Sequence, residues 1–169
     1  MEEKNIQKIV CLIFITVVVF FVGCQAPSES SSIKTESTPN TEDTKALIEL
    51  ERAALDRWNN GDPTGFLELY SDDYTYFDET TKARVDGLDA INKLYAPLAG
   101  KIYNARYEML NPKVQWLGQT GILSFNLVTY SKEENITSRW NSTEVYSKYD
   151  EKWKIVHSHW SFTKHEKLN

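Results

Sequence analysis

The sequence is poor in the residues that usually build covalent or metal-linked scaffolds. Only two Cys and three His occur among its 169 residues. Both cysteines, Cys11 and Cys24, lie near the amino terminus, so the rest of the chain must fold without a disulfide. The 19 Lys and Arg are outnumbered by 24 Asp and Glu, giving a formal net charge of −5. Without a basic block the chain is a poor nucleic-acid binder, because phosphate contacts supply most of that affinity.

The length and the hydropathy exclude two further classes. A chain of 169 residues fits one ordinary domain with one extra segment, and it is too short for a multidomain enzyme. The mean hydropathy of −0.48 excludes a polytopic membrane protein. We therefore expect one domain preceded by a specialised segment.

The amino-terminal segment has the pattern of an export signal. Residues 9–22 are almost uninterrupted Val, Ile, Leu and Phe, which is short for a membrane-spanning helix of about 20 residues. The run ends in Phe21-Val22-Gly23-Cys24, which resembles the lipobox of bacterial lipoproteins, whose Cys is acylated. This predicts a signal peptide over residues 1–23 and lipidation of Cys24. The alternative is an uncleaved signal anchor, with Cys24 an incidental thiol.

The segment after Cys24 has the composition of a tether. Residues 24–41 are rich in Ser, Thr, Pro and Glu and contain one large aliphatic residue, Ile33. Such a segment buries too little apolar surface to offset its ordering entropy, which predicts disorder. We therefore expect an exported protein that is held at a bacterial membrane through acylated Cys24. Gln25 favours the outer membrane where the cell has one.

The remaining sequence predicts helices first and strands afterwards. Apolar residues at helical spacing (Leu47, Leu50, Ala54 and Trp58) predict a first helix, which Asn60-Gly61 ends. A short helix after Asp62-Pro63, a strand over 74–78, a return at 84–85 and a helix over 87–94 follow. Period-two patterns predict strands over 102–110, 114–117, 122–130, 137–149 and 153–163. This order indicates an α+β domain over residues 42–165, with a tail over 166–169.

Several strings resemble one family. Trp58-Asn59-Asn60-Gly61-Asp62, then residues 69–74 (LYSDDY), then Gly87 with Ala90-Ile91 resemble the ketosteroid isomerase and SnoaL-like branch of the nuclear transport factor 2-like superfamily. The closing string over 153–161 (WKIVHSHWS) also resembles the association domain of calmodulin-dependent kinase II. The resemblance covers about residues 44–164. It implies a cone in which helices wrap a curved antiparallel β-sheet around one deep pocket.

The isomerase resemblance implies three candidate catalytic residues. Asp78 matches the general base of the isomerase, near an apolar wall that includes Tyr76, and the alternative is that Asp78 only caps its turn. Glu144 matches the strand position of a protonated acid, and the alternative is that it lies on the outside of the sheet. Tyr95 matches a Tyr of the third helix. Ala54 stands where the isomerase carries its oxyanion-hole Tyr, which makes steroid isomerisation itself a poor fit.

The resemblance to the kinase association domain implies a change in the charge of the pocket. The association domain carries Arg at the positions of Asn126, Glu144 and Trp160, so the pocket of this chain has lost that positive charge. The expected ligand-pocket residues are Trp58, Tyr76, Asn126 and Trp160. A pocket of this kind favours a flat or apolar neutral ligand, or a cation over aromatic faces.

The two late histidines suggest an interface more than a metal site. His157 and His159 point to the same face of a strand, but a zinc site needs at least a third protein ligand. We predict neither a metal nor a cofactor. A homodimer through the outer sheet face, carrying His157, His159 and Trp153, is one expected partner, besides a small-molecule ligand and the lipid bilayer.

Three functions remain open. The leading hypothesis is a tethered domain that binds a small, largely apolar or aromatic ligand. The second is a proton-transfer enzyme of isomerase, cyclase or dehydratase type, with Asp78 as base, Glu144 as acid and Tyr95 or Tyr76 orienting the substrate. The third is an oligomerising scaffold.

Overall fold

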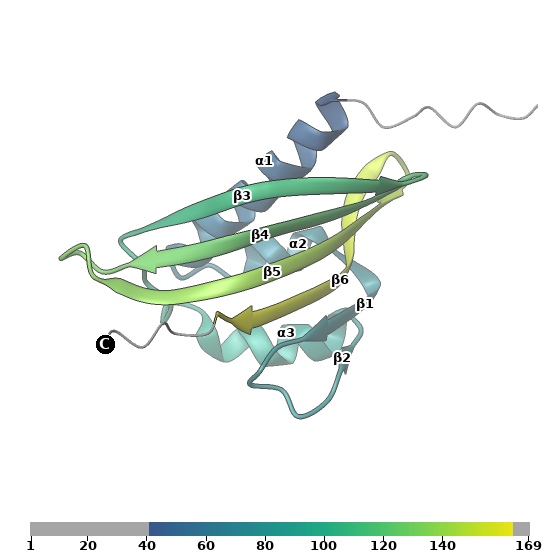
Figure 1. Cartoon of the computed structure of the whole chain (residues 1–169). Coiled ribbons are helices and arrows are strands. Elements are labelled where there is room, and N and C mark those ends of the chain that lie inside the picture. The colour runs from purple at the N-terminus through teal and green to yellow at the C-terminus, as the bar shows by residue number, and fades with distance from the viewer. Residues whose placement is uncertain (1–40, 164–169) are drawn as a thin grey trace, which may run out of the picture. The chain divides into compact units, whose positions relative to one another are not determined.

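The computed structural model describes residues 41–163 (Figure 1). The predicted signal peptide, Cys24, the predicted tether up to residue 40 and the tail over 166–169 lie outside the described residues. Within residues 41–163 no helix is both long and apolar enough to cross a membrane.

Two helices open the described part of the chain. Helix α1 spans Thr41–Asn59, and Glu42 and Asp43 in its first turn suit the positive end of the helix dipole. Its buried face includes Leu47, Ala54 and Leu55, in agreement with the helical spacing of the sequence. Helix α2 spans Thr64–Leu69 and follows a turn at Gly61. Gly61 has a φ of 82°, and a Cβ atom added there would lie 3.1 Å from the Cα of Gly100, so both the backbone conformation and the space disfavour a side chain.

The middle of the chain forms a small strand pair and a third helix. Strand β1 spans Tyr70–Phe77 and pairs antiparallel with the two-residue strand β2, Val85–Asp86. Helix α3 covers Leu88–Tyr95, and the short 3₁₀ helix η1 follows at Ala96–Leu98. Gly87 takes a φ of 86° before α3, a conformation that glycine adopts without steric cost.

Four long strands complete the sheet. They are β3 (Arg106–Leu117), β4 (Thr120–Tyr130), β5 (Ile136–Tyr149) and β6 (Lys152–Phe162). The strand order is β2-β1-β6-β5-β4-β3, and every pair is antiparallel except β1 with β6, which is parallel. The predicted α+β class with a mostly antiparallel sheet is confirmed. The predicted break at Asn111-Pro112 is wrong, because β3 continues through it with a register shift, and Asn111 takes a φ of 51°.

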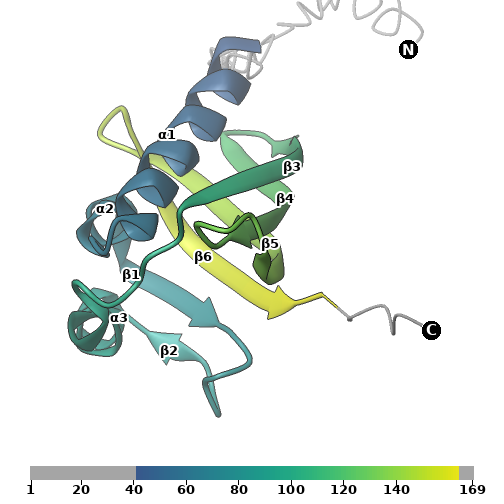
Figure 2. The ribbon, with the colours of Figure 1, turned by 90° about the vertical axis from the view of Figure 1, so that its left-hand side faces the viewer.

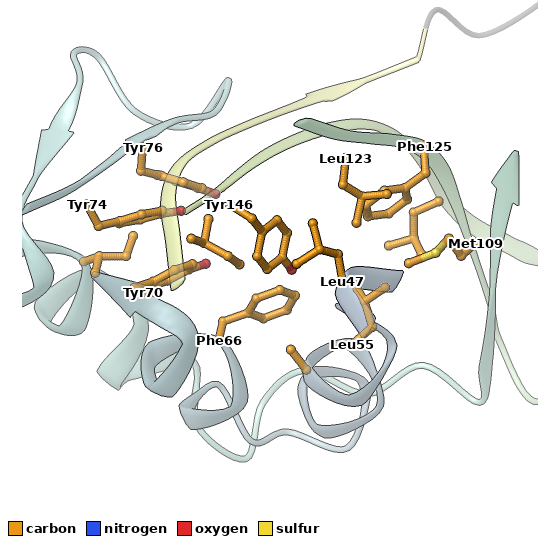
Figure 3. Packing of buried hydrophobic residues seen from close by; sticks show 14 of the residues in the cluster. Leu47, Leu55, Phe66, Tyr70, Tyr74, Tyr76, Met109, Leu123, Phe125 and Tyr146 are labelled. Atoms are coloured by element: carbon orange, nitrogen blue, oxygen red, sulfur yellow. The ribbon is translucent and has the colours of Figure 1, made fainter. Parts of the chain in front are cut away.

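The helices all lie over one face of the curved sheet, which we call the inner face (Figure 2). Between the helices and the sheet lies a core rich in aromatic side chains (Figure 3). In this core the rings of Tyr70, Tyr74 and Tyr76 are layered above one another. Tyr70 and Tyr74 stack with ring centroids 3.7 Å apart. This core occupies the deep part of the space between helices and sheet.

An irregularity in β6 changes the predicted faces of that strand. Tyr146 pairs with Ile155 and Val145 with His157, so Val156 is an extra residue between them. Strict alternation along β6 would place Ile155 on the same face as His157 and His159, but the irregularity turns Ile155 into the core, where it is fully buried. Ser158 and Trp160 remain on the inner face, and His157 and His159 on the outer face.

Candidate functional site: an aromatic cavity

A cavity of about 410 Å³ lies between the inner face of the sheet and the carboxyl-terminal ends of α1 and α3. This volume falls within the range of small-molecule sites, about 300–1,000 Å³. The cavity is lined by Leu55, Trp58, Asn59, Phe66, Tyr70, Tyr76, Asp78, Thr80, Leu94, Tyr95, Leu98, Ile102, Asn104, Leu127, Thr129, Ser138, Trp140 and Trp160.

Aromatic side chains from both layers supply seven of the eighteen residues of its wall. Trp58 of α1 packs edge-to-face on Tyr95 of α3, with centroids 4.9 Å apart. On the sheet side, Trp140 of β5 and Trp160 of β6 meet edge-to-face at 6.3 Å. Tyr76 of β1 contacts Tyr95 in the same way at 6.1 Å, which connects the two layers. These contacts hold the rings in fixed orientations around the cavity.

Asp78 is the acidic group of the cavity wall, directly after β1. Its Oδ1 accepts hydrogen bonds from the backbone N–H of Thr80 and Thr81, at 2.8 and 2.9 Å, and from the Thr80 hydroxyl at 2.8 Å. Its Oδ2 accepts a 2.8 Å bond from the hydroxyl of Tyr76. Asp78 therefore caps its turn, which was one of the two alternatives from the sequence, and it also lines the cavity.

A second polar group lies on the far side of the cavity, where α1 ends. The side chain of Asn104 donates a 2.7 Å hydrogen bond to Oδ1 of Asn59, and the amide of Asn59 donates to the carbonyl of Leu55 at 2.7 Å. On the sheet, the hydroxyls of Thr129 and Ser138 are 2.6 Å apart. Asp78 follows β1 and Thr129 is on β4, three strands away, which is about 14 Å along a sheet. The cavity is thus apolar in the middle and polar at two ends.

Two glutamates are fully buried beneath this cavity and do not line it. Glu144 of β5 accepts hydrogen bonds from Ser158 and, at 3.3 Å, from Ser142. Glu51 of α1 accepts a 2.6 Å bond from Tyr146, and its other oxygen has no partner among the described residues. Burial raises the pKa of Glu51 to about 7. Burial, and then repulsion from Glu51, raises the pKa of Glu144 well above its usual range.

The tyrosine hydroxyls around the cavity are neutral donors. Burial is the main cause that raises the pKa of Tyr95, Tyr76 and Tyr70 above the ordinary value of a phenol. The hydroxyls of Tyr70 and Tyr95 lie 3.3 Å apart. None of these groups is therefore a ready proton acceptor at neutral pH.

The structure brings together most of the residues that the sequence singled out. Five predicted site residues line the cavity: Trp58, Tyr76, Asp78, Tyr95 and Trp160. Glu144 is fully buried and is not part of the cavity wall. Asp78 and Glu144 therefore do not open into one shared cavity.

The predicted pocket position of Asn126 is wrong. Asn126 alternates with the inward residues Phe125 and Leu127, so it lies on the outer face of β4. Its side chain donates a 2.8 Å hydrogen bond to Asn141 of the next strand. Trp153 needs a similar correction, because it packs against Trp116 on the helix side, with centroids 5.5 Å apart, and not on the outer face.

His157 and His159 do lie on the outer face. His157 Nδ1 is 2.8 Å from the Thr75 hydroxyl, and the pKa of His157 is lowered by burial and by its neighbour His159. Across residues 41–163 no three His, Cys, Asp or Glu side chains gather closely enough to hold a metal ion.

Sequence reasoning missed Glu51 and the Asn59–Asn104 pair. Glu51 follows Leu47 by four residues and precedes Ala54 by three, so it falls within the apolar stripe of α1. A glutamate on the apolar side of the helix was the signal from which its burial could have been predicted. Asn59 entered the sequence analysis only as part of the family string Trp58–Asp62, and nothing local marked Asn104 as its partner, 45 residues away.

Solved structures with this architecture define the class of domain. A nuclear transport factor 2-like protein of unknown function from Pseudomonas putida is 17% identical, with a TM-score of 0.66 over 77% of this chain and 93% of that chain. The association domain of the Caenorhabditis (C. elegans) kinase CaMKII is 21% identical, with a TM-score of 0.60 over 71% and 95%. These similarities show the fold, a cone of the nuclear transport factor 2-like type.

Two comparisons go further than the fold. A candidate ketosteroid isomerase from Parabacteroides distasonis is 31% identical, with a TM-score of 0.64 over 76% of this chain and 93% of that chain. The family model of the calcium/calmodulin dependent protein kinase II association domain matches residues 43–164. The chain therefore belongs to this association-domain family. No curated protein matches the chain.

Proposed function

We propose that this protein binds a small, largely apolar or aromatic molecule in its cavity, and that acylated Cys24 tethers it to a bacterial membrane. The observation that carries the binding proposal is the 410 Å³ cavity walled by aromatic side chains. Its polar groups are few and stand at two ends, which is how small-molecule sites fix the orientation of a ligand.

The arrangement of the carboxyl groups favours binding over proton transfer. An isomerase-type mechanism needs a base and an acid that reach one substrate. Asp78 is at the cavity wall, but Glu144 has no exposed surface and is engaged by Ser142 and Ser158. Ala54 supplies no hydroxyl at the helix position of the isomerase oxyanion hole.

A neutral fluorescent probe tests the binding proposal. N-phenyl-1-naphthylamine is titrated against the protein, against Leu98→Trp and against Leu117→Trp. Leu98 is half-buried at the cavity, whereas Leu117 is 67% exposed at the end of β3, so the second variant adds the same bulk outside the cavity. We expect saturable binding that Leu98→Trp weakens at least tenfold and Leu117→Trp leaves within twofold. Equal affinity in all three proteins would place the probe elsewhere and contradict the proposal.

The tether is tested in cells. With the full chain expressed in a bacterium and labelled with a radioactive fatty acid, we expect label on the unaltered protein and none on Cys24→Ala. Cys11→Ala is the matched control, and it should keep the label. Label that survives in Cys24→Ala would exclude this anchor.

The family membership supports a second candidate function, self-association. Relatives are named as an association domain and as hubs of CaMKII. The outer face of the sheet carries a half-buried apolar pair, Ile122 opposite Val145, beside His157. In sedimentation at micromolar concentration we expect a dimer that Val145→Glu dissociates and the exposed Asn92→Glu on α3 does not. A monomer in the unaltered protein would remove this candidate.

A further inference from the structure

We infer that the cavity selects a cationic ligand, an amine on an apolar or aromatic body, with its ammonium group held between Asp78 and the ring of Trp160. The inference rests on the proposed binding function and names the chemical class of its ligand.

The charge of the cavity wall is the first argument. The wall consists of eighteen described residues, of which one, Asp78, is acidic and none is Lys, Arg or His. An anionic ligand would lose its hydration here without meeting a positive side chain of this wall, which is costly. The buried carboxyl groups below, Glu51 and Glu144, also add no positive charge. A cationic ligand, in contrast, meets the opposite charge of the Asp78 carboxylate.

The geometry of Asp78 is the second argument. Three donors from Thr80 and Thr81 fix Oδ1, whereas Oδ2 accepts only the Tyr76 hydroxyl. Each carboxylate oxygen has two lone pairs: the three donors share those of Oδ1, whereas one lone pair of Oδ2 remains for a further donor. Because the turn already holds the carboxylate in place, an ammonium group would bind it without ordering a flexible side chain.

Aromatic faces beside Asp78 are the third argument. Strands β1 and β6 pair in parallel, with Tyr76 beside Ser158 and Phe77 beside His159. Continuing this register by one residue puts Asp78 beside Trp160, and both line the cavity. The face of an indole ring attracts a cation within about 6 Å, most strongly when the site excludes water. The carboxylate and the indole therefore favour the same positive group.

The end of helix α3 adds to this preference. Helix α3 ends on the Asp78 side of the cavity, where Tyr95 contacts Tyr76, the hydrogen-bond partner of Asp78. The carboxyl-terminal end of a helix carries a partial negative charge, which favours a nearby cation. We expect the ammonium group at the Asp78 end and the body of the ligand across the apolar middle, towards the Asn59–Asn104 pair.

Three probes of nearly equal shape test the inference: tryptamine, tryptophol and indole-3-propionate, which are cationic, neutral and anionic at pH 7. Their affinities are measured by calorimetry with the unaltered protein, with Asp78→Asn and with Asp150→Asn. Asp150→Asn removes the same charge from the β5–β6 turn, where the residue has a φ of 47° that Asn tolerates. Asn at position 78 retains an oxygen for the N–H groups of its turn.

We expect tryptamine to bind at least tenfold more tightly than tryptophol, and indole-3-propionate to bind most weakly. Asp78→Asn should weaken tryptamine about tenfold, leave tryptophol within twofold and match Asp150→Asn in its thermal unfolding. Tryptophol or indole-3-propionate binding as tightly as tryptamine would overturn the cationic preference while leaving the binding function in place. No binding of any probe at millimolar concentration, together with no binding of N-phenyl-1-naphthylamine, would overturn both. The probe series needs only the unaltered protein, so it decides the question even if a variant unfolds.

Discussion

The hydroxyl of Tyr146 on β5 donates a 2.6 Å hydrogen bond to Glu51 on α1, across a fully buried core. The two residues are 95 positions apart in the chain, so this bond joins the first helix to the sheet. A carboxyl group in such surroundings is more stable protonated, because burial penalises the charged form. Its titration is therefore linked to the stability of the fold.

This linkage gives a prediction for pH. The pKa of Glu51 is about 7 in the folded protein and 4.5 in an ordinary environment. Between these values the folded state holds a proton that the unfolded state has lost, so the free energy of unfolding falls as the pH rises. The fall amounts to about 3 kcal/mol for this group alone and ends above pH 7. Urea unfolding at pH 5 and pH 8 measures it.

The variant Glu51→Gln should reduce that pH dependence, because an amide does not titrate, whereas Glu144, whose pKa burial also raises, keeps its share. The matched control is Glu49→Gln on the exposed side of the same helix, where the glutamate side chain is 62% exposed. It should keep the slope of the unaltered protein. An unchanged slope in Glu51→Gln would show that another group is responsible.

A second prediction concerns Ser158, which donates a hydrogen bond to Glu144 in the core. Ser158→Ala removes one donor from that buried carboxyl group, whose remaining partners are Ser142, at 3.3 Å, and the side chain of Trp160. We expect a loss of about 1–3 kcal/mol of stability, the usual cost of an unsatisfied buried polar group. Ser161→Ala, the same change on the same strand but on the outer face, should stay within about 0.5 kcal/mol. Equal losses would contradict this assignment.

A third prediction concerns Gly121 at the start of β4. A Cβ atom there would lie 2.6 Å from Leu47 Cδ1 and 3.0 Å from the ring of Trp116. Overpacking of this kind costs about 1–3 kcal/mol, which we expect for Gly121→Ala. Leu47→Val removes the clashing atom, so the double variant should lose less than the sum of the two single changes. Additive losses would mean that Leu47 is not the obstacle.

A fourth prediction compares two neighbouring asparagines at the end of α1. Each amide donates to the carbonyl four residues back, Asn59 to Leu55 at 2.7 Å and Asn60 to Asp56 at 2.8 Å. Asn59 is buried and also accepts from Asn104, whereas Asn60 is exposed. Asn59→Ala should therefore cost about 1–3 kcal/mol and Asn60→Ala less than about 1 kcal/mol. Chemical denaturation of both variants checks the difference.

Periodicity and turn residues predicted most of the fold. The spacing of Leu47, Leu50, Ala54 and Trp58 located α1, and alternation located β4 and β5 to within two residues at each end. The parallel pairing of β1 with β6 was beyond this reasoning, because strand order depends on contacts between segments some 80 residues apart.

The site was predicted in part, and its errors have local causes. Trp160 reached the cavity as expected, since the irregularity at Val156 lies before it in β6. Asn126 was assigned by analogy, and its error shows that one residue of register moves a side chain to the other face of a sheet. Glu51 lies where an apolar residue would be expected, and only its distant partner, Tyr146, accounts for its burial.

The parallel pairing of β1 with β6 has a consequence for how the chain folds. Strand β1 can complete its pairing only when the last strand, β6 (Lys152–Phe162), is present. Contacts so distant in sequence slow folding, because a long loop must close before they form. During synthesis the edge of β1 that pairs with β6 stays unpaired until β6 has left the ribosome. We therefore expect chains truncated before Lys152 to aggregate instead of forming a smaller stable cone.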